Sequence, residues 1–67
     1  MKRPYLVQVN DYMTPVRVIL TENEANAVAY VLEEVVKSDE DALVQIKDED
    51  SGDILFDNYD KWIKTHR

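Results

Sequence analysis

The stretch from Thr21 to Lys37 constrains the fold most, because its pattern fits a helix and little else. Thr21 and Glu24 have the spacing of a capping box, in which the threonine hydroxyl and the glutamate carboxylate each accept a hydrogen bond from the other residue's backbone N–H. Glu22 in the first turn and Lys37 in the last suit the helix dipole. The apolar residues share one stripe that a second layer must cover: Ala25, Val28, Ala29, Leu32, Val35 and Val36.

Segments on both sides of this helix have the composition and alternation of strands. They are residues 4–10, 16–20, 42–47 and 54–58. A turn is expected at residues 10–14, and another at residues 48–53, where Gly52 is free to take a positive φ. Apolar residues recur at helical spacing over residues 59–66, which predicts a short C-terminal helix.

The element order predicts an α+β fold in a single domain, residues 1–67. It is ββαββ: a four-stranded sheet, antiparallel on base rates, with the main helix on one face and the short helix at the C-terminus. The single helix between the second and third strands brings the chain back to the end of the sheet where the second strand began, so these two strands point the same way. An antiparallel sheet then needs strand one beside strand three, or strand two beside strand four, and the pattern does not choose between them. The strand residues expected to meet the helix are Val7, Val9, Val16, Val18, Leu20, Val44, Ile46, Ile54 and Phe56.

One large aliphatic residue of opposite parity is left over in each strand: Leu6, Ile19, Leu43 and Leu55. If the strands are in register, these residues form an apolar stripe on the far face of the sheet. Such a stripe indicates that another part of the chain covers this face or that a partner protein binds there. Two covers are open: the C-terminal helix with Trp62 and Ile63 folds back over the stripe, or a second copy of the chain packs there. The alternative is that the four residues are scattered single hydrophobes that need no cover. These six residues are the candidate apolar interface.

The composition argues against an enzyme. There is no cysteine, so disulfides and thiolate chemistry are excluded and a reducing cytoplasm is expected. A single glycine rules out phosphate-binding and dinucleotide-binding loops, and a single histidine, His66, rules out a two-histidine metal site. Residues 48–53 match a calcium loop only at its first and third positions. We therefore expect no catalytic residues, cofactor or metal, and we expect neither a signal peptide nor a membrane span.

A net charge of −6 argues against direct binding to nucleic acid, which requires a cationic surface. The acids concentrate around the third and fourth strands and form a candidate acidic surface: Asp39, Glu40, Asp41, Asp48, Glu49, Asp50, Asp53 and Asp57. Such charge runs usually serve solubility. The same carboxylates could also imitate a phosphate backbone and occupy the site of a basic DNA- or RNA-binding protein.

Two functions remain open. The first is a small non-enzymatic protein-interaction module, of the kind found among bacterial or phage accessory proteins, which binds itself as a homodimer or binds another protein. The second is an acidic nucleic-acid mimic that inhibits a basic protein. Neither involves a membrane. An apolar interface predicts association that resists salt, whereas mimicry predicts binding that salt weakens.

Overall fold

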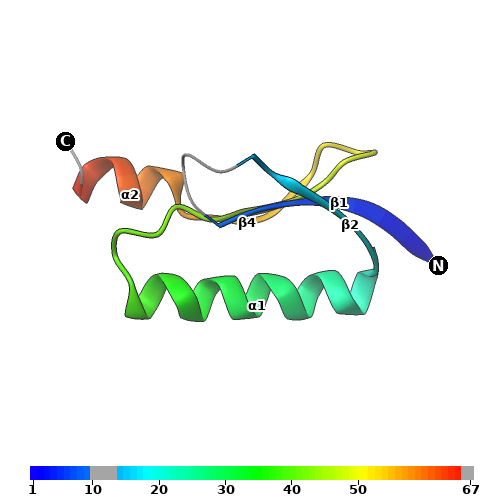
Figure 1. Ribbon diagram of the computed structural model, residues 1–67, viewed down its shortest axis with the longest axis horizontal. Helices are drawn as coiled ribbons and strands as arrows, with labels where there is room; N and C mark the ends of the chain where they lie inside the picture. The colour runs from blue at the N-terminus through cyan, green and yellow to red at the C-terminus, as the bar shows by residue number, and fades with distance from the viewer. Residues whose placement is uncertain (10–13, 66–67) are drawn as a thin grey trace.

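The computed structural model describes residues 1–9 and 14–65, and it shows the expected α+β fold. The main helix lies along one face of the sheet, and the short C-terminal helix lies beyond one end of the sheet (Figure 1). The elements in chain order are β1 (Lys2–Gln8), β2 (Val16–Thr21), α1 (Glu22–Ser38), β3 (Gln45–Asp48), β4 (Ile54–Asp57) and α2 (Tyr59–Thr65).

The start of α1 confirms the capping box. Thr21 has extended backbone angles, its hydroxyl accepts from the N–H of Glu24 at 3.1 Å, and the Glu24 carboxylate accepts from the N–H of Thr21 at 2.8 Å. These two bonds satisfy N–H groups that have no partner within the helix. The pKa of Glu24 is lowered, first because the backbone N–H of Thr21 donates to the Glu24 carboxylate and favours its ionised form, and second through a side-chain hydrogen bond with Thr21.

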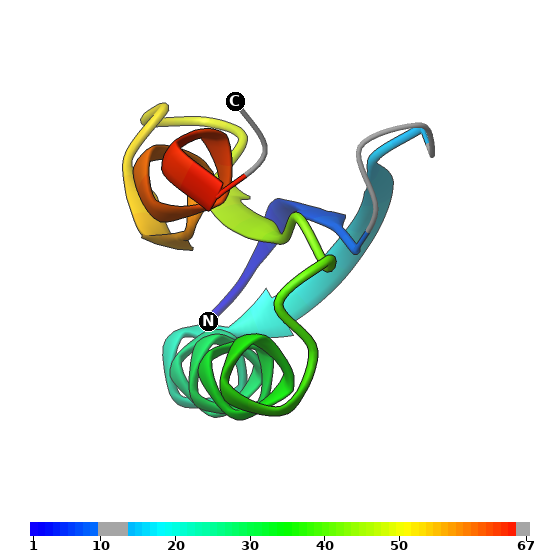
Figure 2. The same ribbon diagram turned by 90° about the vertical axis from the view of Figure 1, so that its left-hand side faces the viewer.

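The sheet is antiparallel throughout, in the order β2-β1-β3-β4. Strand one therefore lies beside strand three, which decides between the two orders that the sequence left open. The chain leaves β2 at one edge, crosses the face as α1, and returns at β3. In Figure 2, β2 and the β3–β4 hairpin lie on opposite sides of the molecule, with α1 against one face.

The core lies between α1 and the two central strands. Its buried members are Tyr5, Ala25, Leu32, Val36, Ala42, Val44 and Ile46. The predicted helix stripe is confirmed, since its other three residues are partly buried against this cluster. Val44 and Ile46 are buried as predicted, and Val7, Leu20 and Phe56 pack against the core. Tyr5 was missing from the predicted core, although it shares the parity of Val7.

Three residues predicted for the core are exposed. Val9 lies beyond the end of β1 and is 43% exposed, while Val16 begins the edge strand β2 and is 57% exposed. Ile54 is 53% exposed because a register shift interrupts the β3–β4 pairing: Ile46 lies opposite Phe56, and the next residue of β3 lies opposite Ile54. Leu55 is the extra residue. The shift breaks the two-residue alternation, so Leu55 and Phe56 both pack against the core.

The turn between β3 and β4 is organised by Asp48. One of its carboxylate oxygens accepts from the N–H groups of Asp50 and Ser51, at 2.9 and 3.2 Å, and its backbone carbonyl accepts from Gly52. Gly52 has a φ of 79°, which confirms the predicted positive φ. The predicted turn at residues 10–14 lies largely outside the described residues, as does His66.

Asn58 joins the start of α2 to the segment before β3. This side chain is buried, its Nδ2 donates to the carbonyl of Ala42 at 2.7 Å, and its Oδ1 accepts from the N–H of Val44 at 2.9 Å. The indole N–H of Trp62 donates to the carbonyl of Asp41 at 3.3 Å. These bonds hold α2 against the segment that follows α1.

Candidate interaction surface

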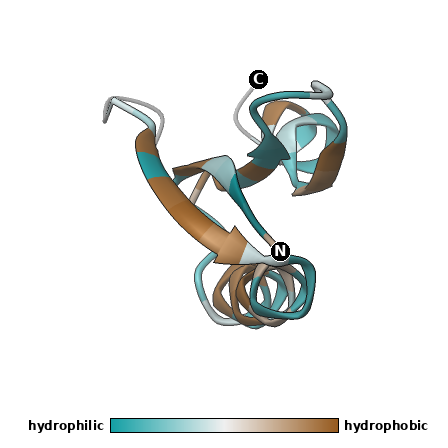
Figure 3. Cartoon of the chain, turned by 90° about the vertical axis from the view of Figure 1, so that its right-hand side faces the viewer, coloured by the Kyte–Doolittle hydropathy of each residue, from teal (hydrophilic) through white to brown (hydrophobic). Residues whose placement is uncertain are grey.

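The β2 strand is one of the two edges of the sheet, and in the described part of the chain only β1 pairs with it. The backbone N–H and C=O groups along its outer side are therefore available to another strand. Five of its six residues are uncharged, and it contains neither proline nor glycine. Figure 3 shows β2 as a mostly hydrophobic strand at one side of the molecule.

Exposed hydrophobic side chains project from both faces of β2. Val16 lies opposite Val7 on the helix side and is 57% exposed. Ile19 lies opposite Pro4 on the far face and is 53% exposed. Natural edge strands are usually protected by charges, prolines, bulges or short length, and β2 has only Arg17 in that role.

The other edge, β4, is protected by comparison. It is four residues long, it contains the register shift, and acidic residues stand just before it and at its end, Asp53 and Asp57. A second strand that paired with β4 would therefore meet an irregular backbone and carboxylates. The contrast singles out β2 as the edge suited to pairing.

The flank of α1 nearest β2 adds to this apolar surface. Glu22 and Asn26 line a hollow together with β4 residues, and Glu33 and Lys37 line another, so this polar flank faces β4. The opposite flank faces β2. It contains Val28 and Val35, which are half-buried, Val31, which is 57% exposed, and the exposed Glu24 near the start of the helix. We define the β2 edge surface as Val16, Ile19 and Val31.

The predicted apolar stripe on the far face does not form as a continuous patch. Leu6 is half-buried but lies between Arg17 and Lys47, its direct neighbours on β2 and β3. Leu43 is half-buried and precedes β3, and Leu55 packs on the helix side of the sheet. Of the four residues of the stripe, Ile19 alone is an exposed apolar side chain on this face, because the basic neighbours of Leu6 and the β4 register shift break the pattern.

The fold-back of the C-terminal helix over the far face, one of the two covers that the sequence left open, is not found. Trp62 and Ile63 are half-buried in α2, but α2 lies beyond the end of the sheet and the Trp62 indole bonds to the chain after α1 (Figure 1). The buried Asn58 anchors the start of α2 there. Sequence reasoning missed this anchor, since a single asparagine after a strand is usually only a turn residue.

Four of the eight predicted acidic residues have structural roles that can be seen directly. Asp48 is paired with Arg3 at 2.8 Å, and Glu49 with Arg17 at 3.2 Å. The carboxylates of Asp39 and Asp57 accept from backbone N–H groups two residues further on, at 3.0 and 3.3 Å. Of the other four, Glu40 and Asp41 lie on the loop after α1, and Asp50 and Asp53 lie in the turn before β4; all four are exposed. The eight acidic residues are therefore divided between separate segments and do not form one continuous row, which a phosphate mimic would need.

Neither a metal site nor a membrane-spanning helix is found within residues 1–9 and 14–65. No group of three or more acidic, histidine or cysteine side chains there is arranged to hold a metal ion. None of the helices there has both the length and the apolar character needed to cross a bilayer. The candidate functional site that the geometry supports is the β2 edge surface, an unpaired strand edge with exposed valine and isoleucine side chains. Comparison of the chain with models of protein families, with curated proteins and with solved structures gave no match.

Proposed function

We propose that the protein is a non-enzymatic protein-interaction module that forms a homodimer through the edge of β2. The observation that supports this most directly is an unprotected edge strand with Val16 and Ile19 exposed on its two faces. Edge strands of this kind pair readily with another strand, and identical strands pair antiparallel about a two-fold axis. Such pairing would join two four-stranded sheets into one of eight strands.

The charges on β2 allow this pairing. Pairing centred on Val18 sets Arg17 opposite Ile19 of the second copy and Val16 opposite Leu20, so no like charges face each other. In this register, side chains that lie opposite each other in the two copies also point to the same face of the joined sheet, as the pleat requires. Both α1 helices then lie on one face, each with the flank that contains Val31 turned toward the two-fold axis.

The size of the chain gives pairing a thermodynamic advantage. A domain of 67 residues buries a small core, and oligomerisation is a common way for such domains to gain stability. The proposal also places the module in a reducing cytoplasm, since a secreted domain of this size usually depends on disulfides and this chain has no cysteine.

The test compares two equally exposed isoleucines on the two edges. Ile19 in β2 and Ile54 in β4 are both 53% exposed, so Ile54→Lys is a matched control for Ile19→Lys. Light scattering and sedimentation across a concentration series should show a dimer for the natural chain, in low and in high salt. We expect Ile19→Lys to be a folded monomer by circular dichroism, and Ile54→Lys to remain a dimer.

Two results would count against the proposal. The first is a natural chain that stays monomeric at every concentration. The second is a dimer that survives Ile19→Lys but dissociates in Ile54→Lys, which would place the interface at the other edge of the sheet.

A further inference from the structure

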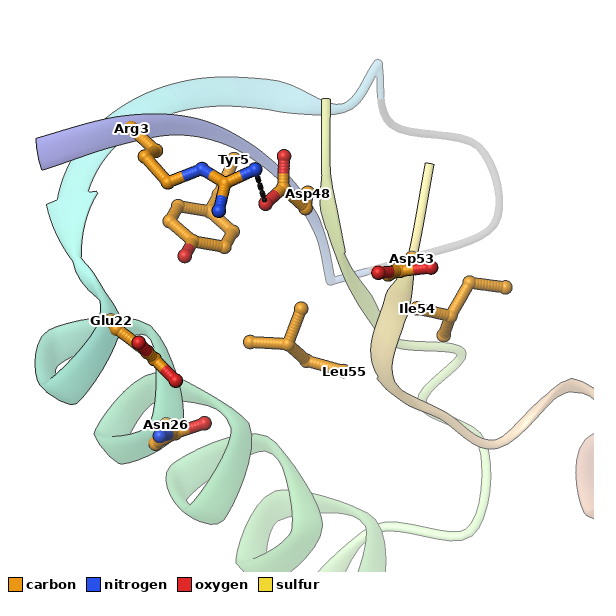
Figure 4. Close-up of a pocket in the computed structure, with 8 residues that line it drawn as sticks. All are labelled: Arg3, Tyr5, Glu22, Asn26, Asp48, Asp53, Ile54 and Leu55. Carbon is orange, nitrogen blue, oxygen red and sulfur yellow. Dashed lines mark ion pairs between the residues drawn. The ribbon is translucent and has the colours of Figure 1, made fainter. Parts of the chain in front are cut away.

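A hollow of about 290 Å³ lies between the first turns of α1 and the β3–β4 hairpin. Its walls come from four elements and the turn after β3 (Figure 4). Tyr5 of β1 and Leu55 of β4 supply apolar surface, and Glu22, Asp48 and Asp53 supply carboxylates. No residue of β2 lines it, so this site is separate from the proposed dimer interface.

The hollow has an excess of negative charge. Arg3 and Asp48 neutralise each other through an ion pair of 2.8 Å between Arg3 Nη2 and Asp48 Oδ2. Glu22 and Asp53 also line the hollow, and within the described part of the chain neither carboxylate makes an ion pair or a hydrogen bond. Two uncompensated carboxylates in one hollow repel anions and favour a cation.

The hydroxyl of Tyr5 is an independent sign of a ligand. Tyr5 is only 3% exposed, and among residues 1–9 and 14–65 its hydroxyl has no hydrogen-bond partner. In the same residues, no fully enclosed side-chain oxygen or nitrogen lacks a partner. The hydroxyl must therefore open into the hollow, and Figure 4 shows it directed toward Glu22. Because the rest of the ring is buried, this open hydroxyl is a fixed donor and acceptor for a molecule that enters the hollow.

We propose that this hollow binds the guanidinium group of an arginine side chain that a partner polypeptide presents. A guanidinium has five N–H donors in one plane, so it can donate to the Tyr5 hydroxyl and to the carboxylates of Glu22 and Asp53 together. Its aliphatic stem can pack against Leu55. It is also less strongly hydrated than an ammonium group, which lowers the cost of entering a hollow with an apolar wall.

The size and geometry of the hollow favour this occupant over others. Its volume is at the lower limit of pockets that enclose a small molecule, so it accommodates one side chain better than a whole metabolite. Glu22, Asp48 and Asp53 come from three separate segments, and no metal-binding group is present in the described part of the chain. A planar cation with several donors can bridge such separated acceptors.

The test uses two peptides that differ only in charge. They are acetyl-Gly-Arg-Gly-amide and the same peptide with citrulline, the neutral isostere of arginine, added to the ¹⁵N-labelled full chain and followed by amide chemical shifts. We expect saturable shifts at Tyr5, Glu22 and Asp53 with the arginine peptide and none with the citrulline peptide. Tyr5→Phe and Glu22→Gln should each weaken binding roughly fivefold, since each removes one hydrogen bond or ion pair.

The control variant is Asp50→Asn, which removes an exposed carboxylate from the same turn as Asp53 but outside the hollow. It should leave the affinity unchanged. The inference is overturned if neither peptide binds, if citrulline binds as well as arginine, or if Asp50→Asn weakens binding as much as Glu22→Gln. Glu22 is exposed, so its variant should fold even if Tyr5→Phe does not. The dimer proposal is unaffected by each outcome, because its test measures self-association and its deciding residue, Ile19, lies outside the hollow.

Discussion

Replacement of Asn58 by alanine should destabilise the fold more than its position after a strand suggests. The side chain makes two buried hydrogen bonds to the backbone, one to the N–H of Val44 and one to the carbonyl of Ala42. Val44 is 1% exposed and Ala42 is 4% exposed, so water cannot readily replace either bond. Asn58→Ala therefore leaves a donor and an acceptor buried without partners.

The size of the effect follows from these two groups. A buried polar group left without a partner costs about 1–3 kcal/mol, so two groups should cost about 2–4 kcal/mol after partial relaxation. A domain of this length has a total unfolding free energy of roughly 3–10 kcal/mol. The loss is then a large share of the total, and the same change also frees the start of α2.

Urea denaturation followed by circular dichroism measures this directly. For a small domain with a slope of about 1 kcal/mol per molar urea, the midpoint should fall by roughly 2 M or more. Asn23→Ala is the matched control, because Asn23 is exposed on α1 and its loss should change the unfolding free energy by less than about 0.5 kcal/mol. If the two variants unfold at the same urea concentration, the two bonds of Asn58 do not stabilise the fold and the reasoning is wrong.

Three further predictions concern local structure. Thr21→Ala should lower the unfolding free energy by about 1 kcal/mol in urea titration, because it removes the side chain that caps α1. The pKa of Glu24 is lowered in the folded state from its ordinary 4.5, so the carboxylate stabilises the fold above that pH, and its stabilisation is lost as the pH falls through the lowered value. Urea titrations at several pH values should therefore show the natural chain losing its advantage over Glu24→Gln on acidification. Gly52→Ala should destabilise by about 1 kcal/mol in the same assay through its φ of 79° alone, since a new Cβ would meet no atom within 4 Å.

The local features could be predicted from the sequence because they depend on neighbours in the chain. The capping box joins residues three apart, and the stripe of α1 follows from the helical repeat, so Thr21, Glu24 and Leu32 are where their spacing indicated. The positive φ of Gly52 likewise follows from a turn whose bonds are all local. The antiparallel sheet could be predicted because antiparallel strand pairs are commoner than parallel ones, and because a single helix connects the second strand to the third.

The features that were missed depend on contacts between distant segments. The register shift in β4 moves Leu55 to the core side, and nothing in the four residues of β4 marks it. The exposure of Val16 depends on how α1 crosses the sheet toward β4, which leaves the start of β2 uncovered. The hollow combines Tyr5, Glu22 and Asp53, residues from separate segments that only the tertiary fold brings together.

The two proposed surfaces differ in chemistry, since one is an apolar strand edge and the other an acidic hollow, and they lie on opposite edges of the sheet. The β2 strand itself contains no acidic residue, so its backbone can pair with that of a second copy although each chain has a net charge of −6. The acidic hollow lies beside β4, at the other edge, and pairing through β2 leaves it exposed. A dimer would thus hold two hollows at the outer edges of one eight-stranded sheet. A partner with two suitably spaced arginines could then bind bivalently, and its overall affinity would exceed that of a single hollow because the second contact forms within the complex.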